Sequence, residues 1–238
     1  MEELRNGERA VLKELERIIE YEFTDKKLLF TALCHTSYAN EMNQINRAIE
    51  SNERLEFLGD AVIELLVCET LYKEFPESSE GEMSQVKSAV ASEETLSEIA
   101  KKIRLGHFLF LGKGEEKTGG RTRNSILADT LEAIAAALYL DGGFQTVKNV
   151  LKKYLDNYIL DYISGKKIFD YKTKLQELTQ ELFKCLPKYK TVENQRGFTS
   201  QVIINGTVYG IGQGISKKEA EKIAAEKAVK LILNSREV

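Results

Sequence analysis

The chain has 238 residues, which at about 150 residues per domain predicts one or two domains. Hydrophobic residues make up 42% of the sequence and charged residues 30%, so the composition supports a folded core and argues against collagen, a coiled coil or intrinsic disorder. The net charge of −3 is unevenly shared, because residues 170–238 carry 12 basic and 8 acidic side chains. This basic end of the chain is a weak indication of a polyanionic partner.

The sequence lacks the features of a membrane or secreted protein. The longest uninterrupted apolar run spans residues 133–140, far short of the roughly 20 residues that cross a bilayer. The first ten residues carry five charged side chains and do not resemble a secretory leader, so we expect a cytoplasmic protein without a membrane partner. Cys34, Cys68 and Cys185 lie far apart and form neither a disulfide framework nor a CxxC metal motif. With only two histidines in addition, any metal ion is expected to be held by oxygen atoms.

Helical periodicity dominates the first two thirds of the chain. Apolar residues recur at steps of three and four, for example in segments 11–19 and 86–103. Turn-forming residues interrupt this pattern at 75–81, 111–120 and 141–143. We therefore predict an all-α domain over residues 1–163, followed by a short, solvated linker at 164–169.

Residues 170–238 follow a different order. A helical stripe ends before Pro187, and after it β-branched and aromatic residues alternate as they do in strands. Asn205-Gly206 predicts a two-residue hairpin, because both residues tolerate a positive φ. Ser216 predicts the N-terminus of a final helix. The order helix, three strands, helix predicts a small α+β domain.

Three carboxylates share one face of a predicted helix. At 100° per residue, Glu53, Glu56 and Asp60 fall within about 60° of one another. Glu64 continues the same stripe one turn further, so the spacing alone does not define where a site would end. A solvated acidic face is the alternative interpretation of this segment.

Two more carboxylates lie in a segment that is apolar nearly all round. Asp129 and Glu132 are three residues apart within residues 126–138, which contain no lysine or arginine to pair with them. Burying unpaired carboxylates is costly, and a divalent cation would offset that cost. If the two segments pack face to face, four carboxylates form an oxygen-only cage that suits Mg²⁺ or Mn²⁺. The predicted ligands are Glu56, Asp60, Asp129 and Glu132. Glu53 and Glu80 would extend the cage toward a second ion.

The segment Asn-Glu-Arg-Leu-Glu-Phe-Leu-Gly-Asp at 52–60 resembles the signature of the ribonuclease III family of double-stranded RNA endonucleases. The resemblance covers nearly the whole chain and extends to residues 35–41, 80–84 and 119–133. It implies an all-α endonuclease domain followed by a double-stranded RNA-binding domain. By this resemblance, the metal ligands are Glu56, Asp60, Asp129 and Glu132, and the catalytic residues are Asp60, Glu132, Glu53 and Glu80.

The resemblance also implies a reaction, Mg²⁺-dependent hydrolysis of double-stranded RNA, with Mn²⁺ as a substitute ion. A metal-activated water would attack the phosphodiester in line and leave 5′-phosphate and 3′-hydroxyl ends. Members of the family work as homodimers in the processing of ribosomal precursors and messages. Phe57 matches the aromatic residue that family members insert into the partner subunit, although the sequence alone favours ordinary core packing for this side chain.

Lysines gather at the start of the last predicted helix. Lys217 and Lys218 lie in its first turn, where the helix dipole disfavours cations, and Lys222 follows one turn later. Lysines and backbone amides at a helix N-terminus form a phosphate site, although a solvated lysine face is equally consistent with the pattern. The resemblance to a double-stranded RNA-binding domain favours RNA, and it implies that the first helix of this domain reaches a minor groove. The positions suited to 2′-hydroxyl contacts are Thr173, Gln176, Glu177 and Gln180.

One segment departs from the family pattern. A Gly-Pro-x-His loop usually joins the first two strands, and here the shorter segment 193–198 takes its place. Arg196 is the candidate to replace the lost contact by touching a phosphate. We therefore expect weaker or less selective RNA binding by the isolated domain.

Two other functions compete with a nuclease. A non-catalytic, dimeric double-stranded RNA-binding protein would use the helical domain for dimerisation alone, but it would not need Asp129 and Glu132 in an apolar helix. A carboxylate metal site for a small phosphorylated substrate would leave the basic domain without a role.

Overall fold

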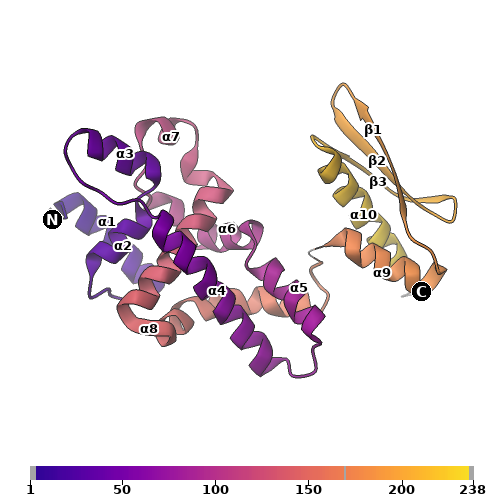
Figure 1. Ribbon diagram of the computed structural model, residues 1–238, viewed down its shortest axis with the longest axis horizontal. Helices are drawn as coiled ribbons and strands as arrows, with labels where there is room; N and C mark the ends of the chain where they lie inside the picture. The colour runs from indigo at the N-terminus through magenta and orange to yellow at the C-terminus, as the bar shows by residue number, and fades with distance from the viewer. Residues whose placement is uncertain (1–3, 169, 236–238) are drawn as a thin grey trace. The chain divides into compact units, whose positions relative to one another are not determined.

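The computed structural model describes residues 4–168 and 170–235 (Figure 1). The chain divides into two compact units, residues 1–166 and 167–238, and each has its own hydrophobic core. The division falls inside the segment 164–169. The remaining residues of the predicted domains and linker, namely 1–3, 169 and 236–238, lie outside the described residues. Within the described part of the chain, every helix is too short or too polar to serve as a membrane span.

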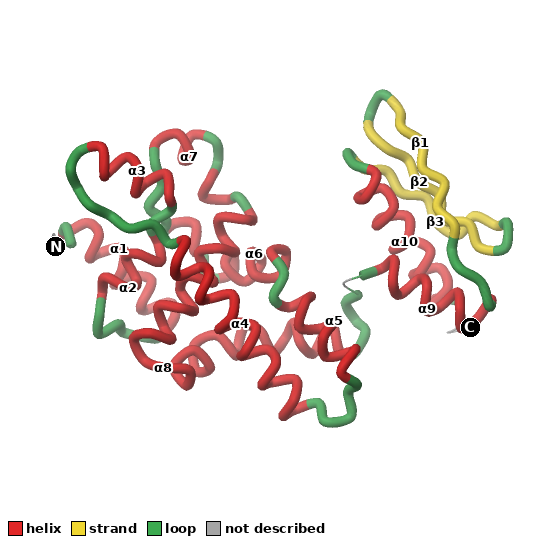
Figure 2. Tube along the Cα trace, viewed as in Figure 1, coloured by secondary structure: helices red, strands yellow, loops and turns green. Residues whose placement is uncertain are grey.

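The first unit is built from helices, as the sequence predicts (Figure 2). They are α1 (Asn6–Ile19), α2 (Lys26–Leu33), α3 (Thr36–Gln44), α4 (Glu53–Glu74), α5 (Glu80–Val90), α6 (Glu93–Lys102), α7 (Lys113–Lys117) and α8 (Asn124–Ile163). Two 3₁₀ turns, η1 (Leu105–His107) and η2 (Gly120–Thr122), lie in the connection between α6 and α8. Helices α4 and α8 form the most extensive interface between any two elements of the described chain, and their apolar faces contribute much of the core.

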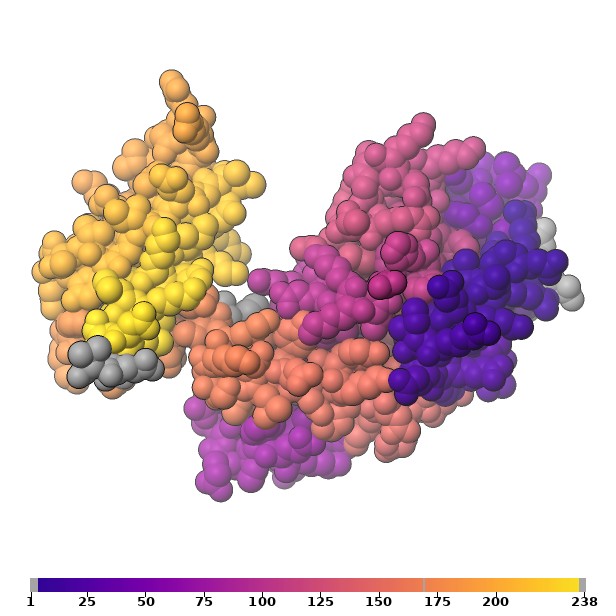
Figure 3. All heavy atoms as spheres, turned by 180° about the vertical axis from the view of Figure 1, so that it is seen from behind, coloured from indigo at the N-terminus to yellow at the C-terminus, as the bar shows by residue number. Residues whose placement is uncertain are grey.

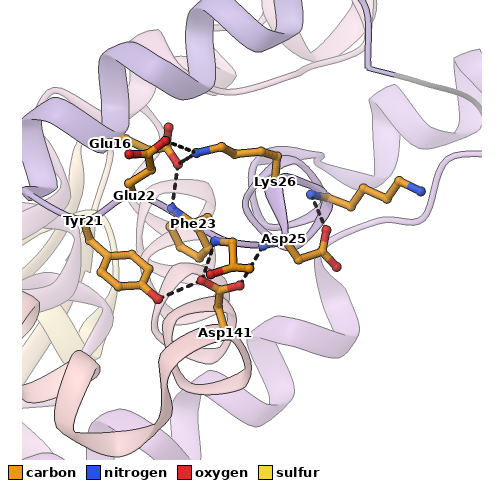
Figure 4. Close-up of polar contacts among 9 residues, drawn as sticks. Glu16, Tyr21, Glu22, Phe23, Asp25, Lys26 and Asp141 are labelled. Atoms are coloured by element: carbon orange, nitrogen blue, oxygen red, sulfur yellow. Dashed lines mark hydrogen bonds and ion pairs between the residues drawn. The ribbon is translucent and has the colours of Figure 1, made fainter.

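Helix α8 bends at residue 143, where the sequence predicts a break. Gly143 has a φ of 75° and a ψ of 177°, a conformation that glycine adopts without strain. Beside the bend, the carboxylate of Asp141 accepts hydrogen bonds from the Tyr21 hydroxyl at 2.7 Å and from the Thr24 amide at 2.9 Å (Figure 4). Burial, together with the hydrogen bond to Asp141, raises the pKa of Tyr21 to about 12. These contacts attach the turn after α1 to the bend in α8.

The second half of α8 contacts helices from the early part of the chain. Figure 3 shows the indigo N-terminal segment beside the orange second half of α8, where Lys153 donates a hydrogen bond to Glu20 at 3.1 Å. Tyr158 in the same half donates to Glu98 of α6 at 3.0 Å. Contacts on both sides of the bend therefore hold α8 in place, and with it Asp129 and Glu132 in its first half.

The second unit has the predicted order of helix, three strands and helix (Figure 1). Its elements are α9 (Tyr171–Phe183), β1 (Lys188–Asn194), β2 (Gly197–Ile204), β3 (Thr207–Gly214) and α10 (Lys217–Asn234). The strands form one antiparallel sheet in the order β1-β2-β3, and the two helices cover one of its faces. Asn205 and Gly206 have φ values of 48° and 85°, which confirms the predicted hairpin. The Ser216 hydroxyl accepts from the Glu219 amide at 3.2 Å and caps α10, also as predicted.

Glycines on β3 let α10 approach the sheet closely. A Cβ atom at Gly210 would overlap the carbonyl oxygen of Ala224, and one at Gly212 would overlap that of Ala220. Small residues on both elements therefore place the start of α10 directly against the strand, a contact that the sequence pattern does not predict. This packing fixes where the lysines of α10 lie relative to the sheet.

Candidate active site

The two acidic helices cross where one of them has no side chain. A Cβ atom at Gly59 of α4 would overlap the carbonyl oxygen of Glu132 in α8. The backbones of the helices therefore touch at this point, which a larger residue would prevent. Glu56 and Asp60 lie on α4 within one turn of the crossing, and Asp129 lies one turn before Glu132 on α8. The face-to-face packing that the predicted metal cage requires is present.

Three of the four predicted ligands meet at the crossing. Glu56, Asp129 and Glu132 each offer a carboxylate oxygen, and the three oxygens lie within 4.8 Å of one another. All three side chains are half-buried, so the cluster is not a fully solvated acidic face. Asp60 is exposed and lies outside this group of three, but its charge raises the pKa of both Glu56 and Glu132. This donor set of clustered carboxylates fits a hard divalent cation.

Burial and mutual repulsion make the charged forms of these acids unfavourable. Burial, followed by the charges of Asp60, Asp129 and Glu56, raises the pKa of Glu132 to about 8. Burial and the neighbouring acids also raise the pKa of Glu56. A bound cation would reverse this preference, because it stabilises the carboxylate form of each ligand.

Asp129 is affected by two residues from outside the predicted set. Its pKa is raised by burial and then by the charge of Glu93, which begins α6, while the proximity of His35 lowers it. No regular spacing relates these residues to Asp129 in the sequence, so the sequence carries no signal for Glu93 and favours a structural role for His35. The His35 ring does have a structural role, since its Nδ1 accepts from the Ser37 amide at 3.2 Å and caps α3.

The remaining acidic residues of the predicted set and of the α4 stripe lie outside this group of three. Glu53 is exposed and accepts a hydrogen bond from the Ser51 hydroxyl at 2.9 Å, and Glu80 is exposed and accepts one from the Ser84 hydroxyl at 2.9 Å. Glu64, which continues the acidic stripe of α4, instead pairs with Lys87 of α5 at 2.9 Å. This ion pair gives Glu64 a structural partner and separates it from the cluster.

The second unit presents the predicted RNA-binding residues on its surface. Thr173, Gln176, Glu177 and Gln180 are exposed at helical spacing along α9, and Lys217, Lys218 and Lys222 are exposed at the start of α10. The segment between β1 and β2 is a tight turn of two residues, Gln195 and Arg196. The Arg196 amide donates to the Asn194 side chain at 2.9 Å, and its side chain is exposed at the tip of the hairpin.

Comparison with known proteins agrees with both units. Residues 25–159 match the family model described as ribonuclease-III-like, and residues 171–232 match the double-stranded RNA binding motif. The first match covers more than half of the chain. The chain belongs to the ribonuclease III family.

Relatives of similar length support this membership. The Ribonuclease 3 of Pseudothermotoga lettingae is 50% identical over 95% of this chain and 98% of its own length. That of Borreliella burgdorferi is 40% identical over 97% of this chain and 95% of its own. Among solved structures, the ribonuclease III nuclease domain of Campylobacter jejuni matches with a TM-score of 0.56 and 38% identity, over 62% of this chain and 97% of that one. The protein is therefore a ribonuclease III-type endoribonuclease that acts on double-stranded RNA.

Hydrogen bonds outside the carboxylate cluster hold the segments that lead into α4, the helix of the ribonuclease III signature, and into α8. The amide of Asn52, just before α4, donates to the Cys34 carbonyl at 2.9 Å. The loop before α8 is held by Arg121, whose guanidinium donates to both carboxylate oxygens of Glu116 and, at 2.9 Å, to the Gly106 carbonyl. The carboxylates of α4 and α8 are thus supported from outside the cluster.

Phe57 lies on the opposite side of the signature helix from the core. Its side chain is 84% exposed, so the interpretation as ordinary core packing is wrong. Leu65 and Tyr72, which follow at eight and fifteen residues, are also exposed, at 52% and 77%. The physical reason is the helical period, since these positions fall on one face of α4 while Gly59 and its neighbours face α8. An apolar stripe of this kind is typical of an interaction surface.

Proposed function

We propose that this protein hydrolyses double-stranded RNA with bound Mg²⁺, for which Mn²⁺ substitutes. The observation that carries the proposal is the meeting of Glu56, Asp129 and Glu132 within 4.8 Å at the crossing of α4 and α8. A bound divalent ion would supply an activated water and would neutralise charge on the leaving oxygen. The products then carry 5′-phosphate and 3′-hydroxyl ends.

The residues divide this work. Glu56, Asp129 and Glu132 would hold the ion, and Asp60, which is exposed, would complete the ligand set. Glu53 and Glu80 are both exposed and would assist near the scissile strand. Burial and mutual repulsion raise the pKa of Glu56 and Glu132, so a bound cation would stabilise their charged forms, which couples ion binding to assembly of the site.

We also propose that the protein works as a homodimer through the apolar stripe of α4. Beside the stripe lies a cavity of about 1060 Å³, lined on α4 by Arg54, Leu55 and Leu58. In a two-fold dimer, Phe57 of each subunit can enter this cavity of the other. The nuclease domain of the Campylobacter jejuni protein has a flexible region involved in dimer formation, which supports a dimer here. We place the activity in the cytoplasm, on duplexes within ribosomal precursors and messages.

Cleavage of a long, end-labelled RNA duplex tests the proposed chemistry. Wild-type protein is expected to cut in Mg²⁺ and not in EDTA, and Glu132→Gln is expected to lower the rate more than about 100-fold, beyond the usual loss for an outer-shell residue. Glu64→Gln is the matched control, because it removes the same charge from the acidic face of α4 at a residue paired with Lys87. If wild-type protein binds the duplex but cuts it in neither Mg²⁺ nor Mn²⁺, the proposal is wrong.

A further inference from the structure

Glu221 in the second unit is a carboxylate among the lysines of the proposed RNA-binding surface. It lies in α10 beside Lys222 and one turn after Lys217 and Lys218, yet its side chain is only 12% exposed. A negative charge here lowers the attraction of the surface for a polyanion. The negative charge of Glu221 therefore does not help this surface to attract RNA, and the role of Glu221 follows from the residues that it contacts.

The contacts of Glu221 join three elements. One carboxylate oxygen lies 2.8 Å from the Lys172 ammonium of α9, and the other accepts a hydrogen bond from the Thr191 hydroxyl of β1 at 3.2 Å. The Thr191 oxygen also lies 2.9 Å from the Ser200 hydroxyl of β2. The Lys172 ammonium lies 4.8 Å from the centre of the Tyr189 ring, a cation–π contact that restricts it further. We refer to Lys172, Thr191 and Glu221 as the Glu221 network.

The Glu221 network connects the two surfaces that are proposed to touch RNA. Lys172 is the neighbour of Thr173, the first of the exposed residues of α9, and the Asp170 carboxylate caps the same turn. Glu221 is within one turn of the lysines of α10. Because a partly buried ion pair joins α9 to α10 and a hydrogen bond joins α10 to β1, the distance between the two surfaces is restricted.

We propose that Lys172, Thr191 and Glu221 are positioning residues that set the spacing of α9 and α10 to an A-form duplex and so favour RNA over DNA. The inference rests on the proposed RNA binding by this unit. In an A-form helix, the minor-groove 2′-hydroxyls and the phosphates across the neighbouring groove are separated differently than in B-form DNA. A fixed spacing between α9 and α10 fits the A-form duplex better than the B-form duplex, whereas the charge of the lysines alone attracts RNA and DNA alike.

Removal of the Glu221 charge is expected to have two opposed effects on nucleic-acid affinity, and comparing RNA with DNA separates them. Loss of the negative charge strengthens the attraction to any polyanion. Loss of the contact with Lys172 loosens the spacing and weakens the fit to RNA alone. For Glu221→Gln we therefore expect DNA affinity to stay level or rise while the ratio of RNA to DNA affinity falls about fivefold, the upper end for a partly exposed pair.

The experiment measures binding of the full chain to RNA and DNA duplexes of one sequence and about 20 base pairs, longer than the roughly 16 that such a domain spans. EDTA in the buffer prevents cleavage. Glu226→Gln is the matched control, since Glu226 lies further along α10 and pairs with Lys230 of the same helix at 2.6 Å. It removes the same charge at a residue whose ion pair lies within α10, so it should leave the ratio unchanged.

Thr191→Val is the second variant, because it removes the hydrogen bond without changing the charge. It should lower RNA affinity and leave DNA affinity unchanged. The proposal is overturned if Glu221→Gln and Glu226→Gln shift RNA and DNA affinity alike, or if Glu221→Gln and Thr191→Val lower the melting temperature with no change in the ratio. Wild-type protein that fails to bind RNA duplex would instead overturn the proposed function, and the inference with it.

Discussion

At the scale of single residues, the chemistry of the site follows from where each carboxylate lies. Glu132 is half-buried and faces three other acids, so its pKa is raised to about 8, whereas Glu64 on the same face of α4 as Glu56 has a lysine partner. Identical side chains at helical spacing thus have different roles. The sequence supplies the spacing, but the neighbours from α5 and α8 determine which acid belongs to the carboxylate cluster at the crossing.

A pH dependence follows from Glu132. Because its folded pKa lies above the ordinary value of 4.5, the folded protein binds more protons than the unfolded chain between these values. Without metal, this contribution to stability is complete below pH 4.5 and is lost as the pH rises through about 8. We expect the melting temperature of the nuclease unit in EDTA to fall between about pH 5.5 and about pH 8, and Glu132→Gln to reduce that fall. Equal slopes for wild-type protein and Glu132→Gln would contradict this origin, and Mg²⁺ should raise stability most at the alkaline end of this range.

At the scale of elements, close approach between backbones positions both functional surfaces. Gly59 allows α4 to touch α8, and Gly210 and Gly212 allow α10 to touch β3. Each contact places one of the charged groups of the proposed function: the carboxylates in the first unit and the lysines in the second. Periodicity predicts the helices and strands themselves, because it depends on neighbours in the chain. It does not predict these crossings, which depend on segments far apart in sequence.

Gly59→Ala tests the importance of the crossing. The added Cβ overlaps the Glu132 carbonyl, so the helices must separate, at a cost of about 1–3 kcal/mol in stability. Separation also spreads the carboxylates, so RNA cleavage in Mg²⁺ should fall more than the loss of folded protein explains. Gly7→Ala in α1 is the control, because nothing lies within 4 Å of a Cβ there. If Gly59→Ala has the melting temperature and the cleavage rate of the wild-type protein, α4 and α8 can shift apart without consequence and the crossing is not important.

At the scale of the whole molecule, the nuclease unit exposes apolar surface that its own core does not use. Phe57, Leu65 and Tyr72 form a stripe along α4 on the side away from α8. The nearby cavity includes Arg54 and Leu58 from the same helix. One helix therefore carries the proposed metal ligands on one side and the proposed dimer surface on the other, so we expect association and catalysis to depend on the same element.

Phe57→Ala should weaken the dimer. We expect sedimentation analysis to show monomers of the variant at concentrations where wild-type protein is dimeric, because a buried aromatic side chain is typically worth several-fold or more in association. Leu186→Ala is the control, since it removes an exposed apolar side chain from the other unit. If Phe57→Ala dimerises with wild-type affinity, or if the wild-type protein is monomeric, the apolar stripe of α4 is not a dimer interface.

The sequence by itself determined the local features of this protein: the helices of the first unit, the hairpin at Asn205-Gly206, the capped start of α10 and the acidic face that contains Glu56. These depend on periodicity, turn conformation and capping, which act between residues close in the chain. Only the tertiary structure decided that Glu56 meets Asp129 and Glu132, that Phe57 faces outward and that Glu221 joins α9 to α10. Each of these depends on which distant segments pack together and how closely, and the size of residues such as Gly59 sets that distance.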